Sequence, residues 1–199
     1  VALNALRGIN SEMGTVSKRV QTGFRVADAA DDAAVFAVAQ GIRGNIKAYS
    51  SVQSSLSAGE GLGQVTNAAL KGVSDTIGEI RAKLALLADG SLNTQQRATY
   101  NADVKKLVGV MQNYVSQANY NGSNLLKTGG ANVSFVSDIA GTTLSLTAAD
   151  IQAAIGTFDG VADVTDAATF TAKNTALTTL ENAVNTAMAT IAAETKSLS

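Results

Sequence analysis

The sequence contains no histidine, no cysteine and no proline among its 199 residues. Without histidine and cysteine the chain lacks the nitrogen and sulfur ligands of zinc, and it cannot form Cys-His nucleophiles or Ser-His triads. The absence of cysteine also excludes disulfide bonds. We therefore predict no catalytic residue, no metal site and no cofactor.

The sequence also has few aromatic residues and almost no net charge. Only 5% of the residues are aromatic, and much of the 46% hydrophobic fraction is alanine and valine, which favours helix-on-helix packing over a thick globular core. The net charge is −1, so the sequence lacks the excess of basic residues that is typical of proteins that bind nucleic acid or anionic membranes. No apolar run approaches the ~18 residues of a membrane span, so we predict none.

The long stretch from Asp31 to Asp89 is predicted to be one helix. Small residues, Gly59, Gly63 and Thr66, lie in the middle of its apolar register, where a neighbouring helix can come close although each glycine costs about 1 kcal/mol against alanine. Such a helix would be roughly 85 Å long, against a radius of about 16 Å for a compact domain of this size, so other molecules should cover part of it. Its larger residues recur at the three-and-four steps of a coiled coil: Tyr49, Val52, Leu56, Leu70, Val73, Ile77, Ile80, Leu84 and Leu87.

The glycines at 59–63 also resemble a phosphate-binding loop. A dinucleotide fingerprint needs a preceding strand, and this segment lies inside a helical apolar pattern. Close helix packing or a local bend is the better interpretation.

Three further amphipathic helices are expected, at residues 1–20, 95–118 and 168–199. The first carries Leu3, Leu6, Met13, Val16 and Val20 on one side. Thr22-Gly23 should end it, and an extended connector should follow. Asp31-Asp32 should cap the long helix, because acidic side chains accept its free backbone N–H groups. Arg97, Lys105 and Lys106 are expected to be solvated side chains rather than a binding patch.

The region after residue 128 has a different character. The β-prone runs 132–136 and 142–146 predict a hairpin, and residues 151–155 predict one or two helical turns. Asp159, Asp163 and Asp166 are compatible with a hard cation, although unpatterned surface acidity is the favoured interpretation.

These patterns predict a mainly α fold, an elongated, rod-like antiparallel helical bundle or coiled coil with a small β-hairpin region. The expected domains are a terminal helix with its connector (1–30), a helical rod domain (31–128 with 168–199), and a hairpin with a variable insert (129–167).

The stretch from Arg19 to Ala34 resembles the amino-terminal signature of bacterial flagellin. In that family the pattern is an arginine, a Leu-Ser-Ser-Gly turn, a second arginine and a Lys-Asp-Asp-Ala-Ala run. Here Gln21 and Thr22 replace the serines, and Ala30 replaces the lysine. The resemblance covers residues 1–126 well, the final helix by its pattern, and residues 129–169 poorly. Further flagellin-like segments are Asn45-Ile46-Lys47, Glu60-Gly61-Leu62 and Ala118-Asn119-Tyr120-Asn121-Gly122.

The resemblance implies a structural subunit of the flagellar filament, acting in motility as a helical homopolymer with other flagellin subunits. It also implies secretion in unfolded form, contact with the flagellar export and cap machinery, and a location in the flagellum or at the cell surface. Flagellins carry paired terminal helices, so the sequence is expected to be a flagellin truncated at both ends that does not build filaments by itself. The interaction residues that the resemblance implies are Arg19, Gly23, Arg25, Asp31, Asp32 and Arg81.

Two other functions are compatible with the residues. A cell-surface, flagellin-like adhesin or polysaccharide-binding protein could recognise a surface glycan through the variable insert, but Phe158 and Phe170 are the only aromatic residues beyond Phe135. An enzyme is the third alternative, and no spacing of acidic, lysine, serine or tyrosine residues supports it.

One departure from the family concerns immune recognition. In flagellins that the animal Toll-like receptor for flagellin detects, the stretch aligned with residues 79–83 begins with arginine and ends with leucine. Here Glu79 reverses the charge and Lys83 replaces the apolar side chain, while Arg81 is retained. We therefore expect a poor ligand for this receptor.

Overall fold

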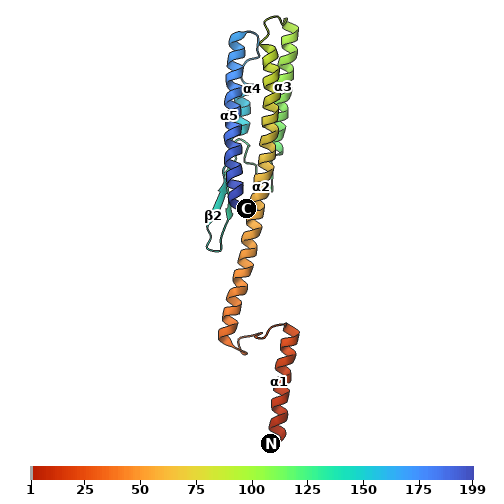
Figure 1. Ribbon diagram of the computed structural model, residues 1–199, viewed down its shortest axis with the longest axis vertical. Coiled ribbons are helices and arrows are strands. Elements are labelled where there is room, and N and C mark those ends of the chain that lie inside the picture. Colours follow the sequence, from red (N-terminus) through yellow and green to blue (C-terminus); the bar gives the residue numbers. More distant parts are fainter. Residues whose placement is uncertain (1) are drawn as a thin grey trace. The chain divides into compact units, whose positions relative to one another are not determined.

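The computed structural model describes residues 2–199, which form five α-helices and one two-stranded antiparallel sheet (Figure 1). The predicted mainly helical fold with a small hairpin is confirmed. No helix in this range is long and apolar enough to cross a membrane. The elements are α1 (Ala2–Thr22), α2 (Ala33–Leu87), α3 (Thr94–Gln117), β1 (Val133–Val136), β2 (Thr143–Leu146), α4 (Ile151–Asp159) and α5 (Ala167–Leu198).

The chain divides into two units, Val1–Ser51 and Val52–Ser199, and α2 contributes to both. Their burial differs sharply. The hydrophobic core lies entirely in the second unit, whereas none of the described residues up to Ser51 is buried. The expected amino-terminal helix is confirmed as α1, and its predicted first residue, Val1, lies outside the described residues.

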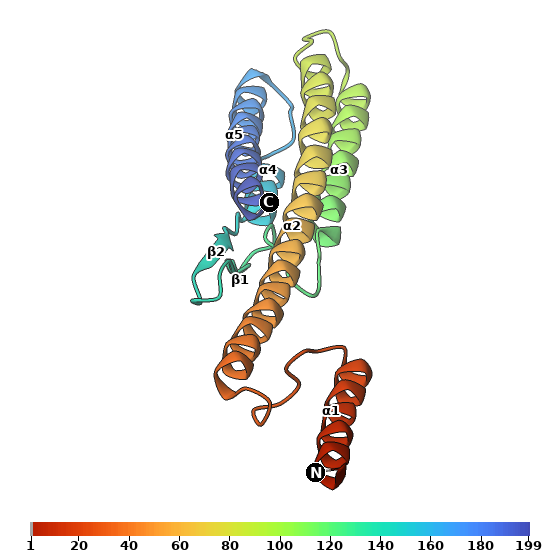
Figure 2. The same ribbon diagram turned by 60° about the horizontal axis from the view of Figure 1, so that its bottom comes forward.

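The second unit is a helical bundle. The later part of α2 lies between α3 and α5, which both run in the opposite direction to α2 (Figures 1 and 2). The short α4 packs against both α3 and α5. Met111 of α3 and Phe158 of α4 are fully buried in this core. The predicted register of α2 is confirmed from Leu70 to Leu87, whereas its proposed first member, Tyr49, is 57% exposed. The side chains of α2 in the core include Leu62, Leu70, Val73, Ile77, Ile80, Leu84 and Leu87.

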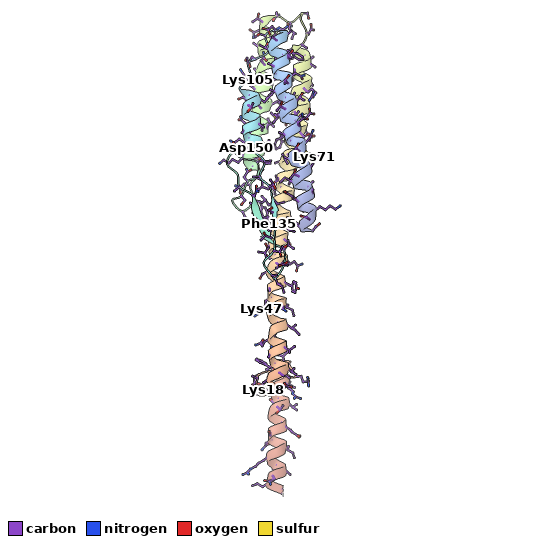
Figure 3. All side chains as sticks on the ribbon, turned by 90° about the vertical axis from the view of Figure 1, so that its left-hand side faces the viewer. Lys18, Lys47, Lys71, Lys105, Phe135 and Asp150 are labelled. Carbon is purple, nitrogen blue, oxygen red and sulfur yellow. The ribbon has the colours of Figure 1, made fainter. Side chains whose placement is uncertain are left out.

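The small residues in the middle of α2 allow the close approach that the sequence predicts. A Cβ atom at Gly63 would lie 2.1 Å from Oγ1 of Thr195 on α5, and one at Gly59 would lie 2.9 Å from Leu198 and from the ring of Phe135. Phe135 lies on the hairpin beside α2 (Figure 3). A phosphate-binding loop is therefore wrong for this segment, because α5 and the hairpin occupy the space beside the glycines.

Specific side chains set the two ends of α2. Asp32 accepts a hydrogen bond from the backbone N–H of Val35 at 3.0 Å, so the helix begins at Ala33, after both of the predicted capping aspartates. Arg97 donates to the carbonyl oxygens of Leu87 at 2.8 Å and Asp89 at 2.7 Å. The expectation that Arg97 is only solvated is wrong, because its guanidinium satisfies carbonyl groups that the helix end leaves without partners.

The hairpin and α4 match the sequence expectations, with Phe135 opposite Leu144 in the antiparallel register. A buried lysine that the sequence analysis did not single out completes this region. Lys173 of α5 donates to the carbonyl oxygens of Phe158 at 3.1 Å and Val161 at 2.7 Å, at the end of α4. Burial lowers the pKa of Lys173.

Two of the three aspartates considered for a cation bind protein groups. Asp163 accepts a hydrogen bond from the ammonium of Lys105 at 2.7 Å. Asp166 caps α5 by accepting from the backbone N–H of Thr169 at 2.8 Å. These contacts explain two of the three acidic residues as parts of the fold.

The close packing of α2 can be tested with two glycine substitutions in the same helix. We expect Gly63→Ala to lower the free energy of unfolding by about 1–3 kcal/mol, because the added methyl group collides with Thr195. Gly78→Ala is the matched control, since a Cβ there meets nothing within 4 Å, and it should raise stability by up to about 1 kcal/mol. Urea denaturation of both variants measures the difference, and equal effects would contradict the packing.

Candidate assembly surface

One side of α1 is apolar and uncovered. Its large side chains project from the helix, between 56% and 78% exposed, and no residue of α1 is buried. They lie at steps of three and four, so they share one side of the helix, and polar residues such as Asn4, Ser11 and Thr15 lie on the opposite side. We call this surface the α1 face; it consists of Leu3, Leu6, Ile9, Met13, Val16 and Val20.

The first part of α2 carries a second surface of this kind. Five large side chains at helical spacing are between 39% and 64% exposed, and a shallow apolar groove follows Val35, Val38 and Ile42. The opposite side of this segment carries Phe36 and Arg43, which are half-buried. We call the uncovered surface the α2 face; it consists of Val35, Val38, Ile42, Ile46 and Tyr49.

The segment between α1 and α2, residues 23–32, is a compact loop that begins at Gly23. We call this segment the turn. The backbone N–H of Gly23 donates to the carbonyl oxygen of Arg19 at 2.8 Å, and its φ of +71° lies in the left-handed region that glycine tolerates best. The helix therefore ends at Thr22, as Thr22-Gly23 predicts. The guanidinium of Arg43 then stacks on the ring of Phe24, 4.1 Å from its centroid, which holds the turn against α2.

Aspartate side chains hold the rest of the turn together. Asp28 accepts from the N–H of Ala30 at 2.9 Å, and Asp31 accepts from the N–H of Ala27 at 3.0 Å. Lys18 of α1 forms ion pairs with both aspartates. The hydrogen bond from Lys18 lowers the pKa of Asp28, and the backbone hydrogen bond from Ala27 lowers the pKa of Asp31. Asp31 thus shapes the turn, while Asp32 caps α2.

The structure places all but one of the predicted interaction residues in or beside this turn. Arg19 and Arg25 are exposed, and neither forms an ion pair within residues 2–199. Gly23, Asp31 and Asp32 have the backbone roles described above. The exception, Arg81, belongs to the second unit, where it pairs with Glu181 of α5.

Sequence reasoning missed Lys18 and the stacked pair of Phe24 and Arg43. A lysine ten residues before its aspartate has no periodic signal, because the intervening turn brings them together. The α2 face was also only partly recognised. Its members continue the three-and-four pattern toward the amino end of α2, so extending the register before Tyr49 would have found them.

A polar cleft in the second unit is the place where a glycan could be expected. Its volume is about 530 Å³, and it is lined by amide, hydroxyl and glycine groups that include Gln112, Asn124 and Gln152. Two of these amides already bind the backbone: Asn124 donates to the carbonyl oxygen of Val115 and Gln152 accepts from the N–H of Thr128. Aromatic rings, the usual platform for sugars, do not line the cleft, so it gives the adhesin alternative no support.

Comparison with known proteins identifies relatives that match most of the chain. The family model of the bacterial flagellin N-terminal helical region matches residues 1–130. The chain is 28% identical to a flagellin of Brucella melitensis biotype 1, over 94% of this chain and 68% of that protein. It is 29% identical to flagellin FljK of Caulobacter vibrioides, over 94% of this chain and 67% of that protein. The crystal structure of Bacillus cereus flagellin is similar in fold, with a TM-score of 0.65 and 23% identity over 73% of this chain and 85% of that chain.

The ion pair in the turn predicts a specific acid response. Lowered carboxyl pKa values mean that Asp28 and Asp31 stabilise the turn above about pH 3.8, and that this stabilisation is lost as the pH falls through their lower values in the folded chain. We expect Lys18→Met to raise the pKa of Asp28 toward 3.8, so that the turn loosens at a higher pH.

Carbon-13 NMR titration of the side-chain carboxyl groups measures this shift. Lys47→Met is the control, because Lys47 lies on the same unit and forms no ion pair in the part of the chain that the structure describes. An unchanged Asp28 titration in Lys18→Met would show that the pair does not form in solution.

Proposed function

Because this chain belongs to the bacterial flagellin family and is a structural subunit of the flagellar filament, an extracellular appendage, we propose that the α1 face and the α2 face are the surfaces that bind neighbouring subunits. Flagellins are a structural protein family rather than an enzymatic one, in agreement with the prediction that this chain is not an enzyme. The same relatives do not favour the adhesin alternative.

The contrast in burial is the observation that supports the proposal. The second unit buries most of its large apolar side chains among its own helices and leaves only scattered ones such as Leu86 exposed, whereas all those of the α1 and α2 faces are exposed. A surface helix of a finished assembly turns such a face toward a core. We therefore propose that neighbouring subunits cover the two faces.

The free energy of burying these side chains is large enough to hold subunits together. Burying a valine, leucine, isoleucine or methionine side chain contributes about 1.5–3 kcal/mol. Association costs an estimated 4 kcal/mol or more in lost rigid-body freedom, so a few members of either face suffice to offset it. A contact between one surface and a different surface of the next copy generates a fibre when the rotation between copies does not close a ring, which is the arrangement that a filament requires.

The turn between α1 and α2 supports this function by fixing the chain between the two faces. Lys18, Asp28 and Asp31 connect the end of α1 to the turn, and Arg43 connects the turn to α2 through Phe24. We propose that Arg19 and Arg25, which are exposed here, contact neighbouring subunits. Following the family resemblance, we also propose that α1 pairs with a carboxy-terminal helix of the flagellin chain.

Secretion belongs to the same proposal. A flagellin reaches the filament by export through a narrow channel, and a chain without disulfides or proline can pass and refold without slow covalent or prolyl steps. We propose that the flagellar export and cap machinery handle this chain in unfolded form.

Poor activation of the Toll-like receptor for flagellin is a further part of the proposal. Glu79 is exposed and places a negative charge where stimulatory flagellins carry arginine. Lys83 pairs with Asp103 of α3 at 3.1 Å, and Arg81 pairs with Glu181 of α5, so both cations are engaged within the bundle.

The assembly proposal is tested with two pairs of serine substitutions in full-length protein. Leu6→Ser with Val16→Ser removes two members of the α1 face, and at about 1.5 kcal/mol each we expect the critical concentration for filament growth to rise roughly 100-fold. Asn4→Ser with Thr15→Ser changes the opposite side and should have little effect. Sedimentation and electron microscopy measure assembly, and circular dichroism of the monomers checks folding. Equal assembly by both double variants would contradict the proposal.

The receptor proposal is tested with the full-length protein in receptor reporter cells. We expect Glu79→Arg with Lys83→Leu to increase the potency of activation roughly thirtyfold, because restoring interface anchors typically recovers about 2 kcal/mol. Asp75→Arg with Lys71→Leu makes the same chemical changes earlier on α2, about one turn before Glu79 and about three turns before Lys83, and should leave potency low. Unmodified protein that matches a stimulatory flagellin would disprove the proposal.

A further inference from the structure

The turn at residues 119–123 belongs to neither apolar face, yet it contains the most labile peptide sequence in the chain. Asn121 is the only asparagine followed by glycine. We propose that Asn121 is a site of spontaneous deamidation to aspartate and isoaspartate, and that the native conformation of this turn suppresses the reaction. The modification then marks chains that have spent time unfolded.

The reaction needs only water. The backbone nitrogen of Gly122 attacks Cγ of Asn121, the side-chain amide leaves as ammonia, and a five-membered succinimide forms. Water opens this ring at either carbonyl carbon, which gives aspartate or isoaspartate at residue 121. Glycine favours the attack because it has no Cβ to hinder the approach, whereas every other asparagine here is followed by a residue with a side chain.

The backbone of the turn opposes ring closure. The attack requires the Gly122 nitrogen to lie on the same side of the Cα–C bond as Cβ of Asn121. Asn121 and Gly122 have φ angles of +49° and +84°. Positive φ at both central residues defines a type I′ turn, in which ψ of the first central residue is about +30°. For an L-residue this ψ turns the following nitrogen almost opposite to Cβ. The native conformation of Asn121 therefore holds the two reacting atoms apart.

Hydrogen bonds hold this conformation in place. Tyr120 and Ser123 exchange two backbone hydrogen bonds of 2.9 Å each, which close the turn around Asn121 and Gly122. The attacking nitrogen itself is engaged, because the N–H of Gly122 donates to Oδ1 of Asn119 at 3.0 Å. Both Asn121 and Gly122 are exposed, so water reaches the site and only the geometry protects it.

The product would disturb the bundle at a defined place. The Tyr120 ring packs against α2 at Gly61, where a Cβ would lie 2.8 Å from its ring. Isoaspartate adds a carbon atom to the backbone, so the paired bonds between Tyr120 and Ser123 no longer fit. A chain modified while unfolded should therefore refold with this contact weakened.

The experiment compares deamidation in the native chain and in urea above its unfolding midpoint, at the same mildly alkaline pH. Peptide mass spectrometry and enzymatic methylation of isoaspartate measure the product at residue 121. We expect the native rate to be lower by about tenfold or more, because reaction must await local opening of the turn. In urea, Asn121→Gln should remove the signal, which identifies the site without depending on folding.

A second pair of variants tests the protection itself in the native chain. Asn119→Ala removes the acceptor of the Gly122 N–H and should raise the native rate severalfold while leaving the rate in urea unchanged. Asn113→Ala, at an exposed position of α3, is the matched control and should change neither rate. Equal native and unfolded rates, or product mainly at another asparagine, would overturn the proposal.

Discussion

The structure of this protein depends on one requirement: the apolar side of each helix must be buried against another surface. A single helix in water is marginally stable, and most of its stability in proteins comes from packing one face against something else. In the second unit α2, α3, α4 and α5 provide this cover for one another. The α1 and α2 faces receive none from the described residues. The fold of the one unit and the assembly role of the other therefore follow from the same requirement.

The glycines of α2 show how the requirement is met inside the bundle. Large side chains would keep α5 away. Gly59 and Gly63 have low helix propensity, but they allow Leu198 and Thr195 of α5 to come close to α2. Thr66 continues the buried side, and its hydroxyl donates to the carbonyl oxygen of Leu62 at 2.8 Å, so this buried hydroxyl has a hydrogen-bond partner.

Periodicity made most of the fold predictable. Steps of three and four identified the helices, and the β-prone runs 132–136 and 142–146 identified the hairpin, because both signals are local. The apolar side of α1 was equally visible, since amphipathicity does not depend on what covers it. The two exact ends of α2 were less accessible, because they depend on which of two adjacent aspartates caps the helix and on Arg97.

Polar contacts between distant residues explain what the sequence could not predict. Arg97 binds the end of α2, Lys173 binds the end of α4, and Lys18 binds Asp28, in each case at a separation set by the folded backbone. Arg7, Lys47 and Lys71 are exposed and form no ion pair in the part of the chain that the structure describes, so residue type alone does not separate the two groups. For the candidate site, the sequence therefore predicted the surface and the turn but not the ion pairs that fix the turn.

The small sheet bears on a different hazard of a protein that polymerises. Exposed strand edges recruit further strands, and such growth would compete with ordered association through helices. Here β1 has only four residues, and the N–H of Val136, which β2 does not use, donates to the hydroxyl of Ser55 on α2 at 3.1 Å. A short strand whose edge is partly occupied by a neighbouring helix makes a poor template for β-aggregation. Association between subunits is therefore left to the helices.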